Sequence, residues 1–590
     1  MEIQRNRARE KHRNRTGFIK SQKSTYRTAK NGRDGEKRKI KDVSRKNYPC
    51  LTLTFLSIRT SSDGSPLPLP SVIRNTLLTN KDVFSTRLNV LFTGFGQFMD
   101  HDVTHQQQID SPDKCCINGK PAPFLNPNTC LPTLFLPNDP FYSKFGITCM
   151  DLKRAVNTYT LGCPIRPVYQ INYQTAFMDL SILYGTSTTK AYSLRALTGG
   201  LLKTSDDART SFQEYPYISS GLKNCPIGGV SPFPGNTCFM AGDSRINQNP
   251  ELLVADTVFL RLHNNLARQL KSLNPQWNDE RIYQEARRLN IAMYQHVISA
   301  EFAPLVVGPF TASLYKLYPL GLGRANGYSP LVNPQTLESY SAAAGRSGHS
   351  AVAGHVNYIG PAGLPETYTL RYKYFNNKFL LGKNMFLNII KAYTREACGK
   401  IDQYFSEEIN NWLFDSIGAP YGQDLSDIDI LRGRDYGLPG YNTFRAACGL
   451  CRLKTFEDLA SEIRNPTDVI KLRALYKNVE DIDLYVGALL EKPLPGSIQG
   501  PTFSCINAES FYRWKFGDRL YYEFPQAGFS QAQLFSIKTT TTWASILCTT
   551  IPFLPAVPRN AFQLPSSQNP LIPCSQIPRI NLMPWKTYTY

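Results

Sequence analysis

The chain has 590 residues, of which 42% are hydrophobic, 12% aromatic and 19% charged. This is a globular composition, and it excludes both a disordered chain and a long coiled coil. No apolar run approaches the ~20 residues that cross a bilayer, so we expect no membrane span. Lys and Arg number 66 against 46 Asp and Glu, and the resulting net charge of +20 makes nucleic acid a partner to consider.

The positive charge is concentrated in the first 50 residues. Residues 1–50 carry 17 Lys or Arg and 5 Asp or Glu, a net charge of +12, whereas the other 540 residues carry a net +8. This stretch has no apolar periodicity, and it lacks the apolar core of a signal peptide. We therefore expect residues 1–50 to be a solvated, disordered tail or a misassembled start, and we expect no nucleic-acid partner.

Helical spacing of apolar residues dominates the rest of the chain. Residues 81–105 predict a helix, because apolar side chains recur there one turn apart. Residues 250–273 predict an amphipathic helix with Pro250 in its first turn, and residues 278–306 predict a second, capped by Asn278 or Asp279. Residues 378–416 also have a helical pattern.

The remaining segments indicate loops and extended chain. Residues 320–365 are rich in Gly and Pro, and the chain from residue 549 to its end is rich in Pro. Strand-like alternation is sparse and short. The sequence therefore predicts a mainly α fold, a single large helical domain over residues 51–590 with few short strands and long loops clamped by disulfides.

Cysteine usage favours disulfides over metal binding. Of the 14 cysteines, Cys448 and Cys451 form a lone CxxC that does not follow a βαβ pattern, which argues against a zinc ribbon or a thioredoxin-like site. Five cysteines crowd into residues 115–163, and Cys225 and Cys238 bracket another Pro/Gly loop. Clamped loops imply an oxidising compartment, although the pairing within residues 115–163 does not follow from spacing.

One histidine stands in a pattern that suits acid–base chemistry. Gln97 and His101 are one helical turn apart on the predicted helix, and Asp100 lies beside them. A buried His near a Gln and two acids can transfer protons. The residues alone fit a satisfied core histidine as well. His263 and His296 lie within amphipathic helices without acidic neighbours, and we interpret them as structural.

A second segment offers oxygen atoms at alternate positions. Thr175, Asp179 and Ser181, with the backbone carbonyl of Phe177 between them, have the spacing of a loop that wraps a hard cation. The same alternation also describes an ordinary polar loop. A contribution from Asp102 across space would favour the cation site.

Six motifs in fixed order resemble one known family. They are FGQFMDHDVTHQ, TAFMDLSILYGTS, AGDSRINQNPEL, LHNNLARQLKSLNPQWNDERIYQEARR, RSGHS and RDYGLPGYNTFR. Over roughly residues 60–590 the chain is similar to the animal haem peroxidase superfamily, including its secreted invertebrate members. The resemblance implies an enzyme that reduces hydrogen peroxide and oxidises phenols, tyrosines or halides through a ferryl intermediate of haem b.

The resemblance also implies roles for individual residues. His101 matches the distal histidine, Arg245 the distal arginine, Gln97 the distal glutamine and His349 the proximal ligand of the haem iron. Asn442 matches the residue that accepts a hydrogen bond from the proximal histidine. The further implied roles are haem propionate pairing by Arg346 and Arg445, and Ca²⁺ binding by Asp102, Thr175, Phe177, Asp179 and Ser181.

The chain departs from the family pattern at the haem attachment points. Asp100 matches the first ester-forming acid, but Gln248 and Asn249 stand where the second acid and a methionine are found. An amide cannot form that ester, so we expect at most one covalent link to haem, through Asp100, and no strong chloride oxidation. By family position, the resemblance implies the disulfides Cys225–Cys238, Cys448–Cys505 and Cys548–Cys574.

Two other functions are consistent with parts of the sequence. One is a haem- and calcium-binding adhesion or matrix protein that has lost turnover, and the joint presence of Gln97, His101, Arg245, His349 and Asn442 argues against it. A nucleic-acid-binding protein would need basic residues on a folded surface rather than in a tail. The resemblance and the cysteines together predict a secreted peroxidase, although no signal peptide is visible in the chain.

Overall fold

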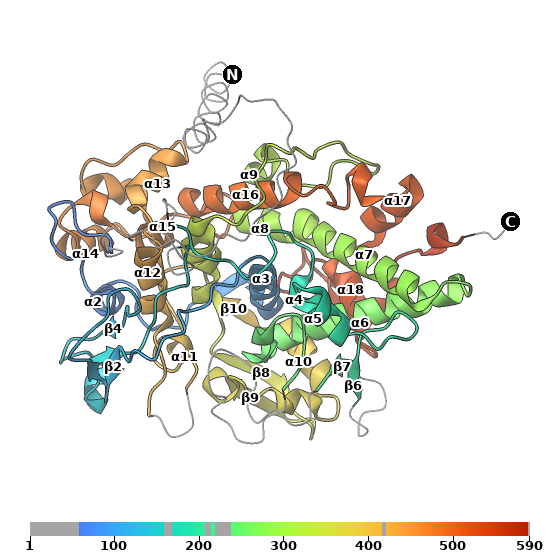
Figure 1. Cartoon of the computed structure of the whole chain (residues 1–590), viewed down its shortest axis with the longest axis horizontal. Coiled ribbons are helices and arrows are strands. Elements are labelled where there is room, and N and C mark those ends of the chain that lie inside the picture. The colour runs from blue at the N-terminus through green and yellow to red at the C-terminus, as the bar shows by residue number, and fades with distance from the viewer. Residues whose placement is uncertain (1–57, 159–167, 207–213, 219–237, 416–419, 588–590) are drawn as a thin grey trace, which may run out of the picture.

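The computed structural model describes residues 58–158, 168–206, 214–218, 238–415 and 420–587. In these residues the chain is mainly helical, and its strands form only short two-stranded antiparallel sheets (Figure 1). The predicted fold class is confirmed. The main hydrophobic core extends from Leu67 to Trp585 and includes residues of nearly every helix, and two small clusters lie apart from it.

Helices of very different lengths build this body. In chain order they are α2 (Pro70–Thr76), α3 (Val90–Val103), α4 (Ser181–Tyr184), α5 (Thr188–Ser193), α6 (Pro250–Leu273), α7 (Asp279–Val297), α8 (Ala303–Val307), α9 (Pro309–Leu314), α10 (Met385–Tyr393), α11 (Glu407–Asn410), α12 (Leu425–Asp435), α13 (Tyr441–Ala447), α14 (Asp468–Leu475), α15 (Leu484–Leu490), α16 (Pro501–Phe516), α17 (Gln531–Thr540) and α18 (Trp543–Thr550). The strand pairs are β1 (Phe84–Asn89) with β10 (Ala397–Gly399), β2 (Cys116–Ile117) with β3 (Lys120–Pro121), β4 (Thr133–Leu134) with β5 (Cys149–Met150), β6 (Thr204–Asp206) with β7 (Glu214–Pro216), β8 (His355–Ile359) with β9 (Pro365–Thr369), and β11 (Ala556–Pro558) with β12 (Leu571–Pro573).

The two long helices follow their sequence signals closely. α6 spans Pro250–Leu273, as predicted, and the side chain of Asn249 accepts the backbone N–H of Leu252 at its start. Asn278 caps α7 by accepting the N–H of Arg281. A π-helical turn over Ile298–Phe302 joins α7 to α8, so that the helical stretch extends to Val307 and covers the expected end at residue 306.

Two predicted helices are shorter than expected. Residues Phe84–Asn89 form a strand instead of the start of a helix, because the apolar spacing begins only at Leu88 and the earlier residues alternate between exposed and half-buried. In the described part of the expected helix over residues 378–416, α10 and α11 are α-helical and Lys378–Leu381 forms a 3₁₀ turn. Strand β10 interrupts the helical pattern and ends at Gly399, where a Cβ would lie 2.6 Å from the carbonyl oxygen of Ser350.

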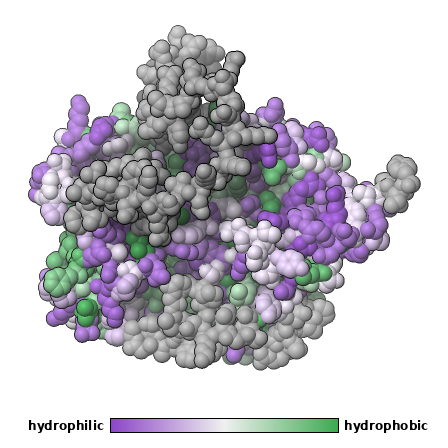
Figure 2. All heavy atoms as spheres, viewed as in Figure 1, coloured by the Kyte–Doolittle hydropathy of each residue, from purple (hydrophilic) through white to green (hydrophobic). Residues whose placement is uncertain are grey.

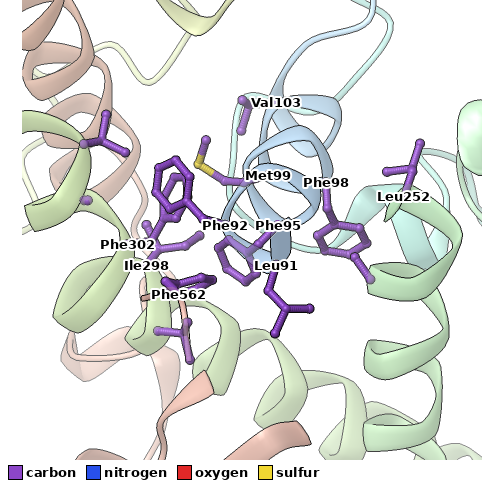
Figure 3. Close-up of a cluster of buried hydrophobic side chains, with 14 of the residues drawn as sticks. Leu91, Phe92, Phe95, Phe98, Met99, Val103, Leu252, Ile298, Phe302 and Phe562 are labelled. Carbon is purple, nitrogen blue, oxygen red and sulfur yellow. The ribbon is translucent and has the colours of Figure 1, made fainter. Parts of the chain in front are cut away.

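Helix α3 lies near the centre of the molecule and is held by aromatic side chains (Figures 1 and 3). The ring of Phe95 lies 5.2 Å from that of Phe302 and 5.0 Å from that of Phe562, between centroids. On the next face, Phe98 stacks on Phe259 of α6 at 5.0 Å. Packing on several sides fixes the rotation of α3, and therefore the direction of the polar side chains on its remaining face.

Disulfides join the loops as the cysteine pattern indicates. Cys448–Cys505 and Cys548–Cys574 are confirmed. In the cysteine-rich loop the pairs are Cys115–Cys130 and Cys116–Cys149. The expected Cys225–Cys238 pair includes a residue outside the described ranges. Cys398, which is buried, and Cys451, which is exposed, are free.

The described surface mixes hydrophilic and hydrophobic residues. Within the described ranges, no helix combines the length and the apolar character needed to cross a bilayer. On the face shown in Figure 2, hydrophilic residues gather toward the side of the molecule where α6 and α7 extend, and hydrophobic residues form small separate groups. Scattered apolar residues of this kind are normal on a folded protein.

Candidate functional site

One cavity collects six of the eight residues that the sequence predicts for catalysis and haem binding. Its volume of about 360 Å³ lies in the usual range for small-molecule and cofactor sites. Helix α3, the turn Ser244–Asn247, the 3₁₀ helix Gly345–Ala351 and helix α12 contribute to its walls. The predicted site residues that line it are Gln97, Asp100, His101, Arg245, Arg346 and His349.

His101 lies in the last turn of α3 and is 7% exposed. Burial, followed by the positive charge of Arg245, holds the pKa of its imidazole well below the usual value of 6.5. The ring is therefore neutral at neutral pH and can accept a proton. Its buried Nδ1 has no hydrogen-bond partner among the described residues.

Arg245 is held in place by the end of α3 and by Asp243. Its Nη2 donates to the backbone carbonyls of His101 (3.1 Å) and Thr104 (2.7 Å), and to the Asp243 carboxylate (2.7 Å). Its Nε donates to the other oxygen of Asp243 at 3.0 Å. The guanidinium is thus a fixed cation next to His101, and no described residue accepts a hydrogen bond from its Nη1.

Gln97 is clamped between two other amides. Its Nε2 donates to Gln248 Oε1 at 2.9 Å, and its Oε1 accepts from Asn249 Nδ2 at 2.8 Å. Both partners lie at the start of α6, and both line the same cavity. The two positions that depart from the family pattern therefore orient Gln97.

Asp100 lies on the cavity wall, where the backbone at Gly345 passes close to its carboxylate. Its carboxylate accepts the hydroxyl of Thr104 at 3.0 Å. A Cβ built on Gly345 would lie 2.9 Å from Asp100 Oδ1, so glycine is required there. Next to His349, by contrast, a Cβ on Gly348 would meet nothing within 4 Å and would extend into the cavity that it lines.

His349 is oriented by a carboxylate that the sequence analysis did not identify. Its Nδ1 lies 2.7 Å from Asp429 Oδ2, and the other oxygen of Asp429 accepts from Arg346 Nη1 at 3.0 Å. Asp429 is in α12 and is fully buried. Because a carboxylate only accepts hydrogen bonds, Nδ1 carries the proton, which leaves the Nε2 lone pair free for a metal.

The expected contact between Asn442 and His349 is not present, and that assignment is wrong. Asn442 is fully buried and donates to the carbonyl of Leu453 and to Glu480, at 2.8 and 2.6 Å. Its Oδ1 accepts the N–H of Leu453. All its hydrogen bonds therefore hold the loop after α13, which does not line the cavity.

One of the two expected propionate partners is also misplaced. Arg445 does not line the cavity, and its guanidinium pairs with Glu491 at 3.3 Å and with Glu462 at 2.9 Å. Arg346 does line the cavity, although it is tied to Asp429. Arg432, one turn after Asp429 on α12, is a further cation on the cavity wall.

The oxygen-rich segment meets Asp102 at the end of α3. Ser181 Oγ lies 3.1 Å from Asp102 Oδ1, and Thr175 Oγ1 lies 2.9 Å from Asp179 Oδ1 and 3.2 Å from the carbonyl oxygen of Phe177. All five predicted residues therefore come together. Across the described part of the chain, no three His, Cys, Asp or Glu side chains form a metal-binding group, so a cation here would depend on hydroxyl and carbonyl oxygens as well.

The electrostatics of this oxygen cluster favour a bound cation. Burial, and then the charge of Asp179, raise the pKa of Asp102 well above its usual value. Burial also raises the pKa of Asp179. A divalent cation between the two would stabilise both carboxylates in their charged form, and hydroxyl, carbonyl and carboxylate oxygens are the ligands that Ca²⁺ prefers.

The cavity residues also have the chemistry that haem binding requires. His349 presents a fixed imidazole with a free Nε2, which is an axial ligand of haem iron in peroxidases. Apolar side chains, including Phe92, Met99 and Val352, line the cavity together with the cations Arg346 and Arg432. An apolar macrocycle with acidic edges matches that combination.

The other two histidines of the long helices are structural, as interpreted from the sequence. His263 Nδ1 lies 2.8 Å from the hydroxyl of Tyr184, and His296 Nδ1 lies 2.7 Å from the hydroxyl of Tyr522. Neither lines the cavity.

Comparisons with known proteins agree with this geometry. A family model described as "Animal haem peroxidase" matches residues 52–562. The chorion peroxidase of Drosophila melanogaster is 34% identical over 89% of this chain, which spans 65% of that protein's length. A Drosophila melanogaster peroxidase is 31% identical, with 89% of this chain and 77% of that protein covered. The lactoperoxidase of Mesocricetus auratus is 30% identical, with 89% and 74% covered.

Solved structures give the same result. Peroxidase A from Dictyostelium discoideum has a TM-score of 0.69 and is 27% identical, with 86% of this chain and 94% of that chain covered. A fatty acid alpha-dioxygenase from Oryza sativa has a TM-score of 0.68 over 86% of this chain and 83% of that chain. At 18% identity that second likeness shows the fold alone. The chain belongs to the animal haem peroxidase family.

Proposed function

We propose that the protein is a haem peroxidase that reduces hydrogen peroxide and oxidises small organic or halide donors. The observation that carries the proposal is the joint lining of one cavity by neutral His101 beside the fixed cation of Arg245, and by His349 with its carboxylate partner. When bound, haem supplies the redox chemistry of peroxide reduction. Side chains of the protein carry out the proton transfer and stabilise the developing charge.

His101 is the general base and acid of the proposed site. Its lowered pKa leaves the imidazole neutral, so that it can take a proton from one oxygen of hydrogen peroxide held in the cavity. The same nitrogen then returns the proton to the departing oxygen, which leaves as water. Proton transfer of this kind contributes ~10²–10⁴ in rate.

Arg245 and Gln97 prepare the space around His101. The Arg245 cation is fixed by Asp243 and by backbone carbonyls, and it stabilises the negative charge that develops as the O–O bond breaks. Because the amides of Gln248 and Asn249 clamp Gln97, that side chain orients water over the cavity without moving. Such preorganisation removes a cost of reorganisation during the reaction.

His349 is the proposed axial ligand, and Arg346 and Arg432 are the proposed cations for the two acidic side chains of haem b. Asp100 is the carboxyl that would form the one covalent ester, because Gln248 carries an amide at the second position. We propose Ca²⁺ as a structural ion bound by Asp102 and by the oxygens of residues 175–181. It would hold the end of α3, and with it His101.

The donors proposed are phenols, tyrosyl groups of proteins and halides, without strong oxidation of chloride. An extracellular location fits the four disulfides that join described cysteines, since such bonds persist in oxidising compartments. A haem-binding matrix protein without turnover is the second candidate, and the presence of His101, Arg245 and Gln97 in one cavity argues against it.

An absorption spectrum of the purified protein before and after peroxide tests the proposal. The native protein should show a Soret band that shifts on addition of peroxide. His349→Ala should lose the band, because the metal loses its axial ligand. His101→Ala should keep the band but react with peroxide ~10²–10⁴-fold more slowly.

A matched control uses a histidine of similar burial outside the cavity. His263→Gln keeps the cavity lining intact, so its Soret band and peroxide reactivity should equal those of the wild type. Normal peroxide reactivity in His101→Ala would show that the acid–base assignment is wrong. A haem-loaded wild type without any reactivity would favour the matrix protein. Unmodified haem released by acid after turnover would refute the ester at Asp100.

A further inference from the structure

We propose that a second cavity, separate from the one that His101 and His349 line, binds a small organic anion with an aromatic body. The cavity lies mainly between α7 and residues 517–529, the segment that links α16 to α17 (Figure 1). Its volume of about 850 Å³ falls within the usual range for small-molecule sites. The two cavities have no described lining residue in common, so this proposal goes beyond the proposed function and does not depend on haem.

Four arginines line the second cavity, and three of them have no acidic partner. Arg281, Arg287 and Arg288 come from α7, and Arg519 comes from the segment after α16. Arg288 pairs with Glu285. In the part of the chain that the structure describes, no carboxylate forms an ion pair with Arg281, Arg287 or Arg519, and no residue accepts a hydrogen bond from their guanidinium groups. These cations are therefore available to a ligand.

Aromatic rings hold two of the arginines in place. The guanidinium of Arg287 lies over the ring of Tyr184, 4.9 Å from its centroid, and that of Arg288 lies over Phe529 at 4.2 Å. Arg288 Nη1 also donates to the carbonyl of Ala527 at 2.8 Å. A guanidinium held against a ring face keeps N–H groups free at its edge, and such an edge can donate two parallel hydrogen bonds to one carboxylate or sulfonate. The half-buried Arg287 is thus a preformed anion donor.

The carboxylates on the cavity wall are engaged elsewhere. Glu285 Oε1 accepts from Arg288 and from the indole N–H of Trp585, the latter at 2.8 Å. Asp518 Oδ1 accepts the backbone N–H two residues further on, at 2.7 Å. Asp179 belongs to the oxygen cluster described above and accepts the hydroxyl of Thr175. The four lining arginines outnumber these three lining carboxylates, so the cavity favours a negative ligand.

Much of the remaining wall is apolar, and it determines the rest of the ligand. Phe177, Ile291, Leu520 and Phe529 all line the cavity. An inorganic anion on the arginines would leave these side chains against water, whereas an aromatic ring would remove them from water and could stack on the phenylalanines. The site therefore fits a carboxylate or sulfonate attached to an aromatic ring better than free sulfate or phosphate.

Calorimetric titration of the full-length protein with 2-naphthoate tests both parts of the ligand. We expect saturable binding of 2-naphthoate. The neutral 2-naphthamide should bind at least about tenfold more weakly, because hydrogen bonds to a charged partner are lost. Inorganic sulfate should also bind at least about tenfold more weakly, because it buries no apolar surface. Equal affinity for the amide would overturn the role of the arginines, and equal affinity for sulfate would overturn the aromatic part of the proposal.

Three variants locate the bound naphthoate. Arg287→Gln and Arg519→Gln should each weaken its binding about tenfold, because each removes one charged donor. Arg519 is exposed, so its variant should fold normally. The matched control is Arg395→Gln, since Arg395 is also exposed and lines neither cavity, and its affinity should equal that of the wild type. Unchanged affinity in both Arg287→Gln and Arg519→Gln would place the naphthoate elsewhere and overturn the proposal, as would an equal loss in Arg395→Gln.

Discussion

Truncation of Phe95 to alanine should destabilise the protein more than most single changes. The side chain is 1% exposed, lies in the middle of α3 and does not line the cavity. The rings within 6.3 Å of its centroid are those of Phe259, Tyr294, Phe302, Trp543 and Phe562. These rings come from several distant segments, so the cavity left by truncation cannot close by the movement of one element.

The expected loss follows from that packing. Truncation of a buried Phe to Ala costs about 3–5 kcal/mol through lost transfer free energy and the remaining cavity. We expect the upper part of this range for Phe95, because its aromatic contacts on several sides are lost together and each is worth about 0.5–1.5 kcal/mol beyond area burial. Since His101 lies on the same helix, loosening of α3 should also weaken haem binding.

Urea unfolding of the wild type and of Phe95→Ala measures this loss through the shift of the midpoint at constant slope. Phe124→Ala is the matched control, because Phe124 is 93% exposed, and its change should stay within about 0.5 kcal/mol. A loss below about 1.5 kcal/mol for Phe95→Ala, with unchanged haem affinity, would refute the view that this cluster positions α3.

Three other predictions concern stability. Added Ca²⁺ should raise the unfolding midpoint of the wild type but not of Asp179→Ala, and an equal rise in both would exclude the site. Burial lowers the pKa of His263 and His296 to about 4. The unfolded chain therefore binds protons at these residues before the folded protein does, and each residue loses on the order of 3 kcal/mol of stability as pH falls from 6.5 to 4. Replacing both by Gln should reduce the dependence of the free energy of unfolding on pH between pH 6.5 and 4. An unchanged pH dependence would contradict the burial argument. Changing Cys448 and Cys505 to Ser should cost about 4 kcal/mol for a separation of 57 residues, measured by urea unfolding, whereas no change would show that the crosslink does not constrain the unfolded chain.

Local signals explain where the sequence predicted the fold correctly. α6 and α7 have caps, long amphipathic stripes and no internal breakers, so their bounds followed from residues within the helices themselves. The strand Phe84–Asn89 depends instead on a partner more than 300 residues away, in β10. No local pattern in the sequence indicates this strand pairing. The apolar residues of α3, which follow directly, made the predicted helix begin too early.

The site shows the same division between local and distant information. Gln97, Asp100 and His101 share one helix, so their proximity followed from spacing along the chain. The partner of His349 lies 80 residues further on, in a helix whose acidic residues are all buried and give no amphipathic contrast. Asn442, in the neighbouring motif, carries an amide that could accept a hydrogen bond from His349. Its side chain instead bonds to the backbone of Leu453, in the loop after its own helix.

Both histidines of the cavity depend on an arginine–aspartate pair, although the pairs act in different ways. Asp243 holds Arg245, whose guanidinium donates to the backbone carbonyl of His101, and burial together with the charge of Arg245 lowers the pKa of the His101 imidazole. Asp429 contacts the ring of His349 directly, and Arg346 offsets its charge. A ring that must accept a proton needs no acid against it, whereas a ring that must bind a metal gains from one. The two arrangements support the proposed roles of proton transfer for His101 and metal binding for His349, independently of the order of motifs along the chain.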